Sequence, residues 1–92
     1  MNIEFDPAKN EKNIRERGLS FERVTEIDFD TALIYPDTRH DYGETRYISL
    51  CYLEKRLHVL VFTEIEQGIR VISFRKANDK EAKRHDKLKA ID

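Results

Sequence analysis

The alternation of apolar and polar residues predicts a set of strands in the second half of the chain. The predicted strands cover residues 32–35, 45–53, 57–65 and 69–76. Tight turns at Glu54-Lys55 and Glu66-Gln67-Gly68 join the last three, which favours an antiparallel meander. The third run is apolar at nearly every position from Leu57 to Phe62, as is typical of a strand covered on both faces.

The first third of the chain predicts a short strand followed by two helices. Residues 2–5 alternate like a strand that ends at Asp6-Pro7, where the aspartate can cap a helix and the proline suits its first position. Gly18 is a typical helix terminator. Ser20 then caps a second predicted helix over residues 21–29, whose apolar side chains fall on one face.

A lysine-rich helix is predicted at the end of the chain. It begins at Asn78, with Glu81 three residues on in a capping-box arrangement, and its thin apolar side consists of Ala82, Leu88 and Ile91. The polar stretch 36–44 is the longest predicted loop. The element order indicates one α+β domain over residues 1–92, with the helices segregated to one side of a mainly antiparallel sheet. An N-terminal strand and two helices pack on that sheet, and a basic helix follows at the C-terminus.

Composition adds a charge asymmetry to this picture. The 92 residues carry a formal net charge of −1. Residues 1–44 hold six Lys or Arg against eleven Asp or Glu, whereas residues 69–92 hold eight against four. A basic C-terminal part can attract phosphate groups or an acidic partner whatever the total charge.

Cysteine content and hydropathy indicate the compartment. Cys51 is the only cysteine, so no intramolecular disulfide can form, and we expect it to be a small core residue in a reducing cytoplasm. The N-terminus has no apolar leader-like segment, and the longest nearly apolar stretch, 57–63, is too short to span a bilayer. We therefore expect a cytoplasmic protein without a membrane association.

The stretch RVISFRKA, residues 70–77, places cations at both ends of an apolar strand. Strand alternation predicts that Arg70 and Arg75 point to opposite faces. In a simple meander Arg70 lies at one end of the sheet with Arg46 and Glu64, while Arg75 lies nearer the other end with Ser73 and the cap of the last helix.

Two interpretations of these cations stay open. Arginine binds phosphate through a planar, permanently charged fork, so the set could hold an RNA backbone while a glutamate moves the proton of a ribose 2′-hydroxyl. The alternative is a cross-strand network of ion pairs on a solvated face. Likewise the stripe at one side of the last helix could follow a phosphate backbone or be an ordinary solvated surface; it consists of Lys80, Lys83, Arg84 and Lys87.

The histidines indicate no further chemistry. His40, His58 and His85 have no partner at metal-ligand spacing, so no metal site is predicted. We expect His58 to be a hydrogen-bonded strand residue and His85 to be a solvated helix residue. The three glycines are isolated, so no phosphate-cradling glycine loop is predicted either.

An ordered series of short motifs resembles the BrnT family of toxins from bacterial type II toxin–antitoxin pairs. The matching features are FDPAK (5–9), Asn13, GLSFE (18–22), GETR (43–46), LVFTE (60–64) and RVISFRKA (70–77) followed by Glu81. They run in the family's order over nearly the whole chain. The family commonly has Lys-His before the glycine of the second motif, where this chain has Glu16-Arg17.

The resemblance implies a RelE-like ribonuclease fold and a metal-independent endoribonuclease that cleaves RNA and thereby inhibits translation, with no cofactor. It also implies a hetero-oligomer with a BrnA-like antitoxin. In that complex only the antitoxin would contact DNA. By the residues that match the family's polar motif, together with the strand argument above, the candidate catalytic set is Glu44, Arg46, Glu64, Arg70, Ser73 and Arg75. Candidate RNA-binding residues are Lys76, Lys80, Lys83, Arg84 and Lys87.

Two other functions remain compatible with the sequence. The basic C-terminal part could be a non-catalytic module that binds RNA or an antitoxin. The acidic and basic halves could also serve assembly alone, in an inactive partner subunit.

Overall fold

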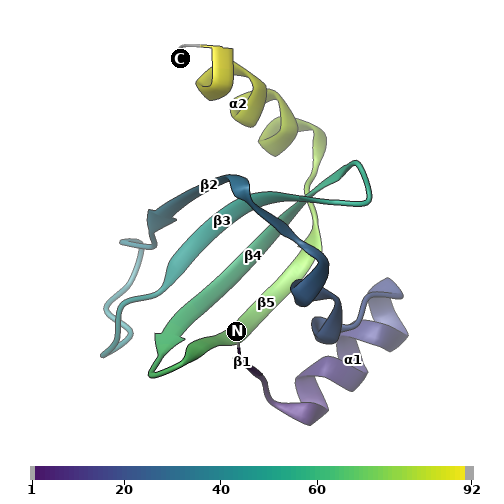
Figure 1. Ribbon diagram of the computed structural model, residues 1–92, viewed down its shortest axis with the longest axis vertical. Helices are drawn as coiled ribbons and strands as arrows, with labels where there is room; N and C mark the ends of the chain where they lie inside the picture. The colour runs from purple at the N-terminus through teal and green to yellow at the C-terminus, as the bar shows by residue number, and fades with distance from the viewer. Residues whose placement is uncertain (1, 91–92) are drawn as a thin grey trace.

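A computed structural model describes residues 2–90 (Figure 1). Its elements in chain order are β1 (Asn2–Glu4), α1 (Pro7–Arg17), the 3₁₀ segment η1 (Phe21–Glu26), β2 (Asp28–Pro36), β3 (Tyr47–Leu53), β4 (Arg56–Ile65), β5 (Gly68–Lys76) and α2 (Asp79–Ala90). The chain is therefore α+β, as predicted. Within residues 2–90 no helix has the length and apolar character that crossing a membrane requires.

The five strands form one mainly antiparallel sheet in the order β1-β5-β4-β3-β2. The predicted meander of β3, β4 and β5 is confirmed, and β2 extends it as a further antiparallel strand. Glu54 and Lys55 both adopt positive φ in the turn between β3 and β4. β1 pairs in parallel with β5. The approach of these two strands requires Gly68, because a Cβ at that position would lie 1.8 Å from the carbonyl oxygen of Asn2.

The predicted second helix is wrong over part of its length. Residues Phe21–Glu26 form a 3₁₀ segment, capped by Ser20 as expected, and β2 begins already at Asp28. β2 is accordingly longer than the predicted strand 32–35. Only Phe21 and Val24 of the segment are buried, so a single short turn is enough to place both against the sheet.

The sheet buries apolar side chains on both faces. The first cluster includes the buried residues of η1 and contains the most deeply buried side chains, among them Val24, Cys51, Leu60 and Phe74. The second cluster lies on the opposite face and is smaller, consisting of Leu50, Leu57, Val59 and Ala77. The first cluster is thus the main core, and the second face is only partly covered.

Helix α1 begins and ends as predicted, with Asp6 accepting a hydrogen bond from the backbone of Ala8 and Gly18 in the left-handed conformation. No residue of α1 is buried. Two asparagine side chains attach it instead. The amide of Asn13 donates to the carbonyl oxygens of Leu19 and Phe74, each at 2.9 Å, and Asn10 Oδ1 accepts from the backbone N–H of Phe21 at 2.7 Å.

Helix α2 lies at the other end of the sheet from α1 and projects from the end of β5 (Figure 1). Its capping box is confirmed, since Asn78 and Glu81 exchange hydrogen bonds of 2.9 and 2.8 Å. Ala82 packs against the second cluster, so the prediction that all helices lie on one side of the sheet is wrong. His85 is buried, packed edge-on against Tyr52, and is not the solvated residue that was expected. The predicted apolar residue Ile91 lies outside the described residues.

A β-bulge interrupts the ladder between β4 and β5. Val61 pairs with Ser73, but the next residue of β4, Phe62, pairs with Val71. Ile72 is therefore an extra residue in β5. An extra residue reverses the alternation of all side chains that follow it.

The bulge changes the placement of the two arginines of β5. Val71 and Phe74 both belong to the first cluster although they are three residues apart. Arg70 and Arg75 consequently lie on the same face of the sheet, opposite that cluster. The prediction that they point to opposite faces is wrong, because simple alternation does not hold through residue 72.

Candidate functional site

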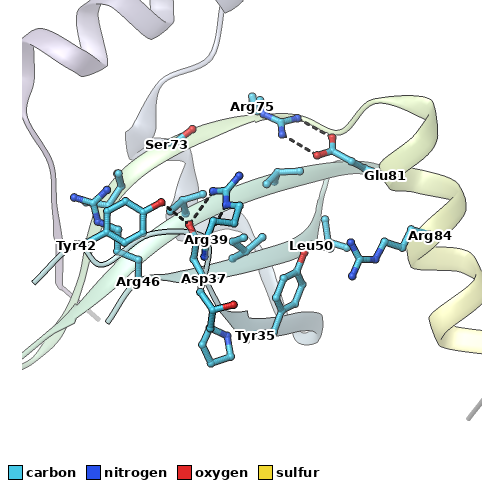
Figure 2. A pocket seen from close by; sticks show the side chains of 16 residues that line it. Tyr35, Asp37, Arg39, Tyr42, Arg46, Leu50, Ser73, Arg75, Glu81 and Arg84 are labelled. Carbon is cyan, nitrogen blue, oxygen red and sulfur yellow. Dashed lines mark hydrogen bonds and ion pairs between the residues drawn. The ribbon is translucent and has the colours of Figure 1, made fainter. Parts of the chain in front are cut away.

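A groove of about 670 Å³ lies on the second face of the sheet (Figure 2). Its floor is apolar and comes from the three central strands, with Ile48, Leu50, Val59, Val61 and Ile72. Arginines from three parts of the chain line it as well: two come from the β2–β3 loop, one from the end of β5 and one from helix α2. They are Arg39, Arg46, Arg75 and Arg84. The groove therefore combines an apolar base with a cationic border.

The loop between β2 and β3 is fixed by a buried carboxylate. The side chain of Asp37 is only 1% exposed. Its carboxylate accepts hydrogen bonds from the backbone N–H of Arg39, from two guanidinium nitrogens of Arg39 and from the Tyr42 hydroxyl. The hydrogen bonds from Arg39 hold the pKa of Asp37 well below its ordinary value. The Arg39 side chain itself remains 66% exposed, so its charge is held in position yet open to a ligand.

Arg46 is positioned by an aromatic ring and a carboxylate. Its guanidinium lies 4.1 Å from the centroid of the Tyr42 ring, and its Nε donates to Glu44 at 3.3 Å. Glu44 also accepts two hydrogen bonds from Arg70, at 2.8 and 3.1 Å. Arg70 and Arg46 together hold the pKa of Glu44 below its ordinary value, Arg70 contributing more. Glu44 is thus an anion that orients two arginines.

Arg75 joins β5 to helix α2. Its two terminal nitrogens donate to the two oxygens of Glu81 at 2.7 and 2.8 Å, as the dashed lines in Figure 2 show. The same carboxylate accepts from the backbone of Asn78 in the capping box. Arg75 lowers the pKa of Glu81, which keeps the pair ionised. The predicted placement of Arg75 beside the start of the last helix is confirmed.

The groove gathers only some of the residues that the sequence singled out. Arg46, Ser73, Arg75 and Arg84 line it. Glu44 and Arg70 lie next to Arg46 rather than in the groove. The predicted set of Arg46, Glu64 and Arg70 is wrong in one member: Glu64 lies on the face of the first cluster, where its carboxylate raises the pKa of Tyr47. The remaining predicted cations are exposed but do not line the groove: Lys76, Lys80, Lys83 and Lys87.

The sequence analysis missed the aromatic and charged groove residues that precede Arg46: Tyr35, Asp37, Arg39 and Tyr42. All four lie at the end of β2 or in the polar loop after it. A usable signal was present, because an aspartate directly after a proline commonly forms a turn in which its side chain accepts from the N–H two residues on. Asp37 does this with Arg39, at 3.1 Å.

Replacing Asp37 by asparagine should change how stability depends on pH. The pKa of Asp37 is lowered in the folded protein, so its stabilising effect is fully present above the ordinary aspartate pKa of about 3.9 and is lost as pH falls below it. We expect Asp37→Asn to lower the denaturant midpoint strongly at pH 7 and less at pH 3. Asp30→Asn, at an exposed strand position, is the control and should show no such difference. An equal loss at both pH values would contradict the assignment.

Other reactive groups lie away from the groove. Burial raises the pKa of the Cys51 thiol to about 11, in agreement with its predicted place in the core. His58 is buried and its Nδ1 lies 2.8 Å from the carbonyl oxygen of Arg56, as expected of a satisfied strand residue. In residues 2–90 no three His, Cys, Asp or Glu side chains gather in a way that could hold a metal ion.

Comparison with known protein families gives one match that covers most of the chain. Residues 5–81 match the family described as "Ribonuclease toxin, BrnT, of type II toxin-antitoxin system". A comparison with curated proteins gives no match. The matched range includes strands β2 to β5 and every groove residue except Arg84. The chain therefore belongs to the BrnT family of ribonuclease toxins of type II toxin–antitoxin systems.

Proposed function

We propose that residues 1–92 form one toxin domain, a metal-independent endoribonuclease that inhibits translation by cleaving RNA in the arginine-lined groove. The observation that carries this proposal is the convergence of Arg39 and Arg46, from the β2–β3 loop, and Arg75, from β5, on one concave surface. Fixed guanidinium groups stabilise the charge that develops on a phosphate during cleavage. The match to a ribonuclease toxin family supports the same activity.

The reaction proposed for the groove needs no redox partner. The ribose 2′-oxygen attacks the adjacent phosphorus, the bond from phosphorus to the 5′-oxygen breaks, and a 2′,3′-cyclic phosphate remains. The 2′-proton leaves to water, and the departing 5′-oxygen takes up a proton. Arg46 and Arg75 bind the non-bridging phosphate oxygens, and the Ser73 hydroxyl donates a further hydrogen bond.

The other predicted catalytic residues have different proposed roles. Glu44, with its lowered pKa, is a weak proton acceptor and is better suited to orient Arg46 and Arg70. We propose no catalytic role for Glu64, which lies on the other face. The cations outside the groove provide general attraction to the RNA backbone; they are Lys76, Lys80, Lys83 and Lys87.

The partner follows from the family. A type II toxin acts with an antitoxin, and we propose that here it is BrnA-like, covers the groove in a hetero-oligomer and carries all contact with DNA. We further propose that the protein acts in the cytoplasm and that its sheet is RelE-like. These points rest on the resemblance of the motifs and not on the geometry of the groove.

Cleavage of RNA in the presence of EDTA tests the proposal. The purified toxin should cut single-stranded RNA under these conditions and leave DNA of the same sequence intact, because DNA lacks the attacking 2′-hydroxyl. RNA that is bound but not cut would favour the non-catalytic binding module, whose affinity should fall with salt and with substitutions of Lys80, Lys83 and Lys87. If EDTA abolishes cleavage, the proposal that the enzyme is metal-independent is wrong, but the proposal that it is a ribonuclease still stands.

Growth on induction tests the role in the cell. Expression of the toxin by itself should stop growth and translation, and co-expression of the antitoxin should restore both. Normal growth when the toxin is expressed without the antitoxin would favour the alternative that the chain is an inactive partner subunit.

A further inference from the structure

Two cation–aromatic pairs border the groove, and they differ in spacing. The Arg46 guanidinium carbon lies 4.1 Å from the Tyr42 ring centroid, whereas that of Arg84 lies 6.0 Å from the Tyr35 ring centroid. Figure 2 shows Arg84 and Tyr35 entering the same end of the groove, one from α2 and the other from β2. The first pair is in contact, and the second is open.

The open spacing is close to what a flat molecule between the two groups requires. Atoms in van der Waals contact are about 3.5–4 Å apart, so a planar base with a contact on each side needs about 7 Å. The 6.0 Å from the Arg84 guanidinium carbon to the Tyr35 ring centroid is longer than a single van der Waals contact. It is about 1 Å shorter than the separation that a base stacked between the two groups needs. Arg84 is exposed on its helix, and a small change in its side chain would supply the difference.

The surroundings of this pair favour a nucleic-acid base over a simple ion. Ile48, which pairs with Tyr35, and Val61, which pairs with Ile48, are half-buried apolar residues of the groove floor and offer no hydrogen-bonding side chain. Arg39 and Arg75 carry the positive charge along the border. A single-stranded nucleotide chain presents apolar bases and anionic phosphates together, which matches this combination of surfaces.

We propose that the ring of Tyr35 and the guanidinium of Arg84 form a slot for one unpaired RNA base. This inference rests on the proposed ribonuclease function and deepens it, because it names single-stranded RNA as the substrate class. In a duplex the bases are stacked and paired inside the helix and cannot enter such a slot without unpairing. The toxin should therefore bind and cut unpaired segments in preference to duplexes.

Binding of uncleavable RNA tests the slot separately from catalysis. Fluorescence anisotropy would compare a short 2′-O-methyl RNA as a single strand and as a blunt duplex. We expect the single strand to bind more tightly, Tyr35→Ala to weaken that binding about 5- to 150-fold, and Tyr35→Phe to retain it. Arg84→Lys keeps the charge without the planar group and should lose a large part of the affinity.

A double-mutant cycle with abasic RNA makes the test specific to the base. Removing the base that occupies the slot should weaken binding to the wild type but have little further effect on Tyr35→Ala, since both changes remove the same contact. Circular dichroism would confirm that the variants are folded. Additive losses at every abasic position, or equal binding of single strand and duplex, would overturn the proposal even if RNA is cleaved.

The antitoxin provides the remaining arm of the experiment. If Tyr35→Ala and Arg84→Lys weaken binding of the antitoxin but leave RNA binding unchanged, the pair contacts protein and the base slot is wrong. If both variants lose RNA affinity as expected while the wild type cuts no RNA, the slot stands and the proposed catalytic function fails. The two proposals can thus be separated.

Discussion

Replacing Arg46 by alanine should lower the rate of RNA cleavage about 100-fold or more, the usual effect of removing one fixed donor from a charge-stabilising site. Arg46 lines the groove, and its guanidinium is held by the Tyr42 ring and by Glu44. Loss of this group removes stabilisation of the transition state, so single-turnover rates should fall more than RNA affinity. Quantification of cleaved end-labelled RNA at saturating protein measures the effect.

Two control variants separate this effect from general charge and from folding. Arg46→Lys keeps the charge but cannot bind phosphate through two parallel hydrogen bonds, so it should recover only part of the rate. Arg17→Ala removes an exposed arginine from α1, outside the groove, and should cut RNA at close to the wild-type rate. If Arg46→Ala and Arg17→Ala have the same activity, Arg46 is not part of the site.

Replacing Phe74 by alanine should lower the free energy of unfolding by about 3–5 kcal/mol, as is usual when a large core side chain is removed. Phe74 is 0% exposed and its ring lies 5.3 Å from that of His58. Domains of this size have only about 5–15 kcal/mol of stability in total, so much of it would be lost. Urea denaturation followed by circular dichroism measures the change.

Ile34 offers a control for the core prediction. It is a large apolar residue in β2 that is 46% exposed, and Ile34→Ala should change stability by about 0.5 kcal/mol or less. A loss at Phe74 as small as that at Ile34 would mean that the first cluster is not the main core.

The sequence was sufficient for features that depend on neighbouring residues. The strands from 47 to 76, their turns, the cap at Asp6 and the capping box at Asn78 and Glu81 were all predicted, because alternation and capping are local effects. The strand pattern and the family motif also indicated Arg46, Ser73 and Arg75, and the basic stripe of the last helix indicated Arg84; all four line one groove.

Features that depend on distant parts of the chain were not predicted. The bulge at Ile72 has no signal in its own residues, yet it decides on which face Arg75 lies. Asn13 looked like a polar helix residue, but it holds α1 to β5 through the carbonyl oxygen of Phe74. The apolar pattern that extended the predicted helix over residues 27–29 was overridden by pairing of β2 with β3, which tertiary contacts can impose on a local pattern.

The parallel pairing of the first strand with the last has a consequence for how the toxin is made. Asn2 pairs with Gly68, so the first strand emerges early from the ribosome and waits for a partner that is synthesised 66 residues later. Phe74, at the centre of the core, comes later still. Such long-range contacts slow folding. We expect the sheet to stay incomplete, and the groove unformed, until residues 68–76 have been synthesised.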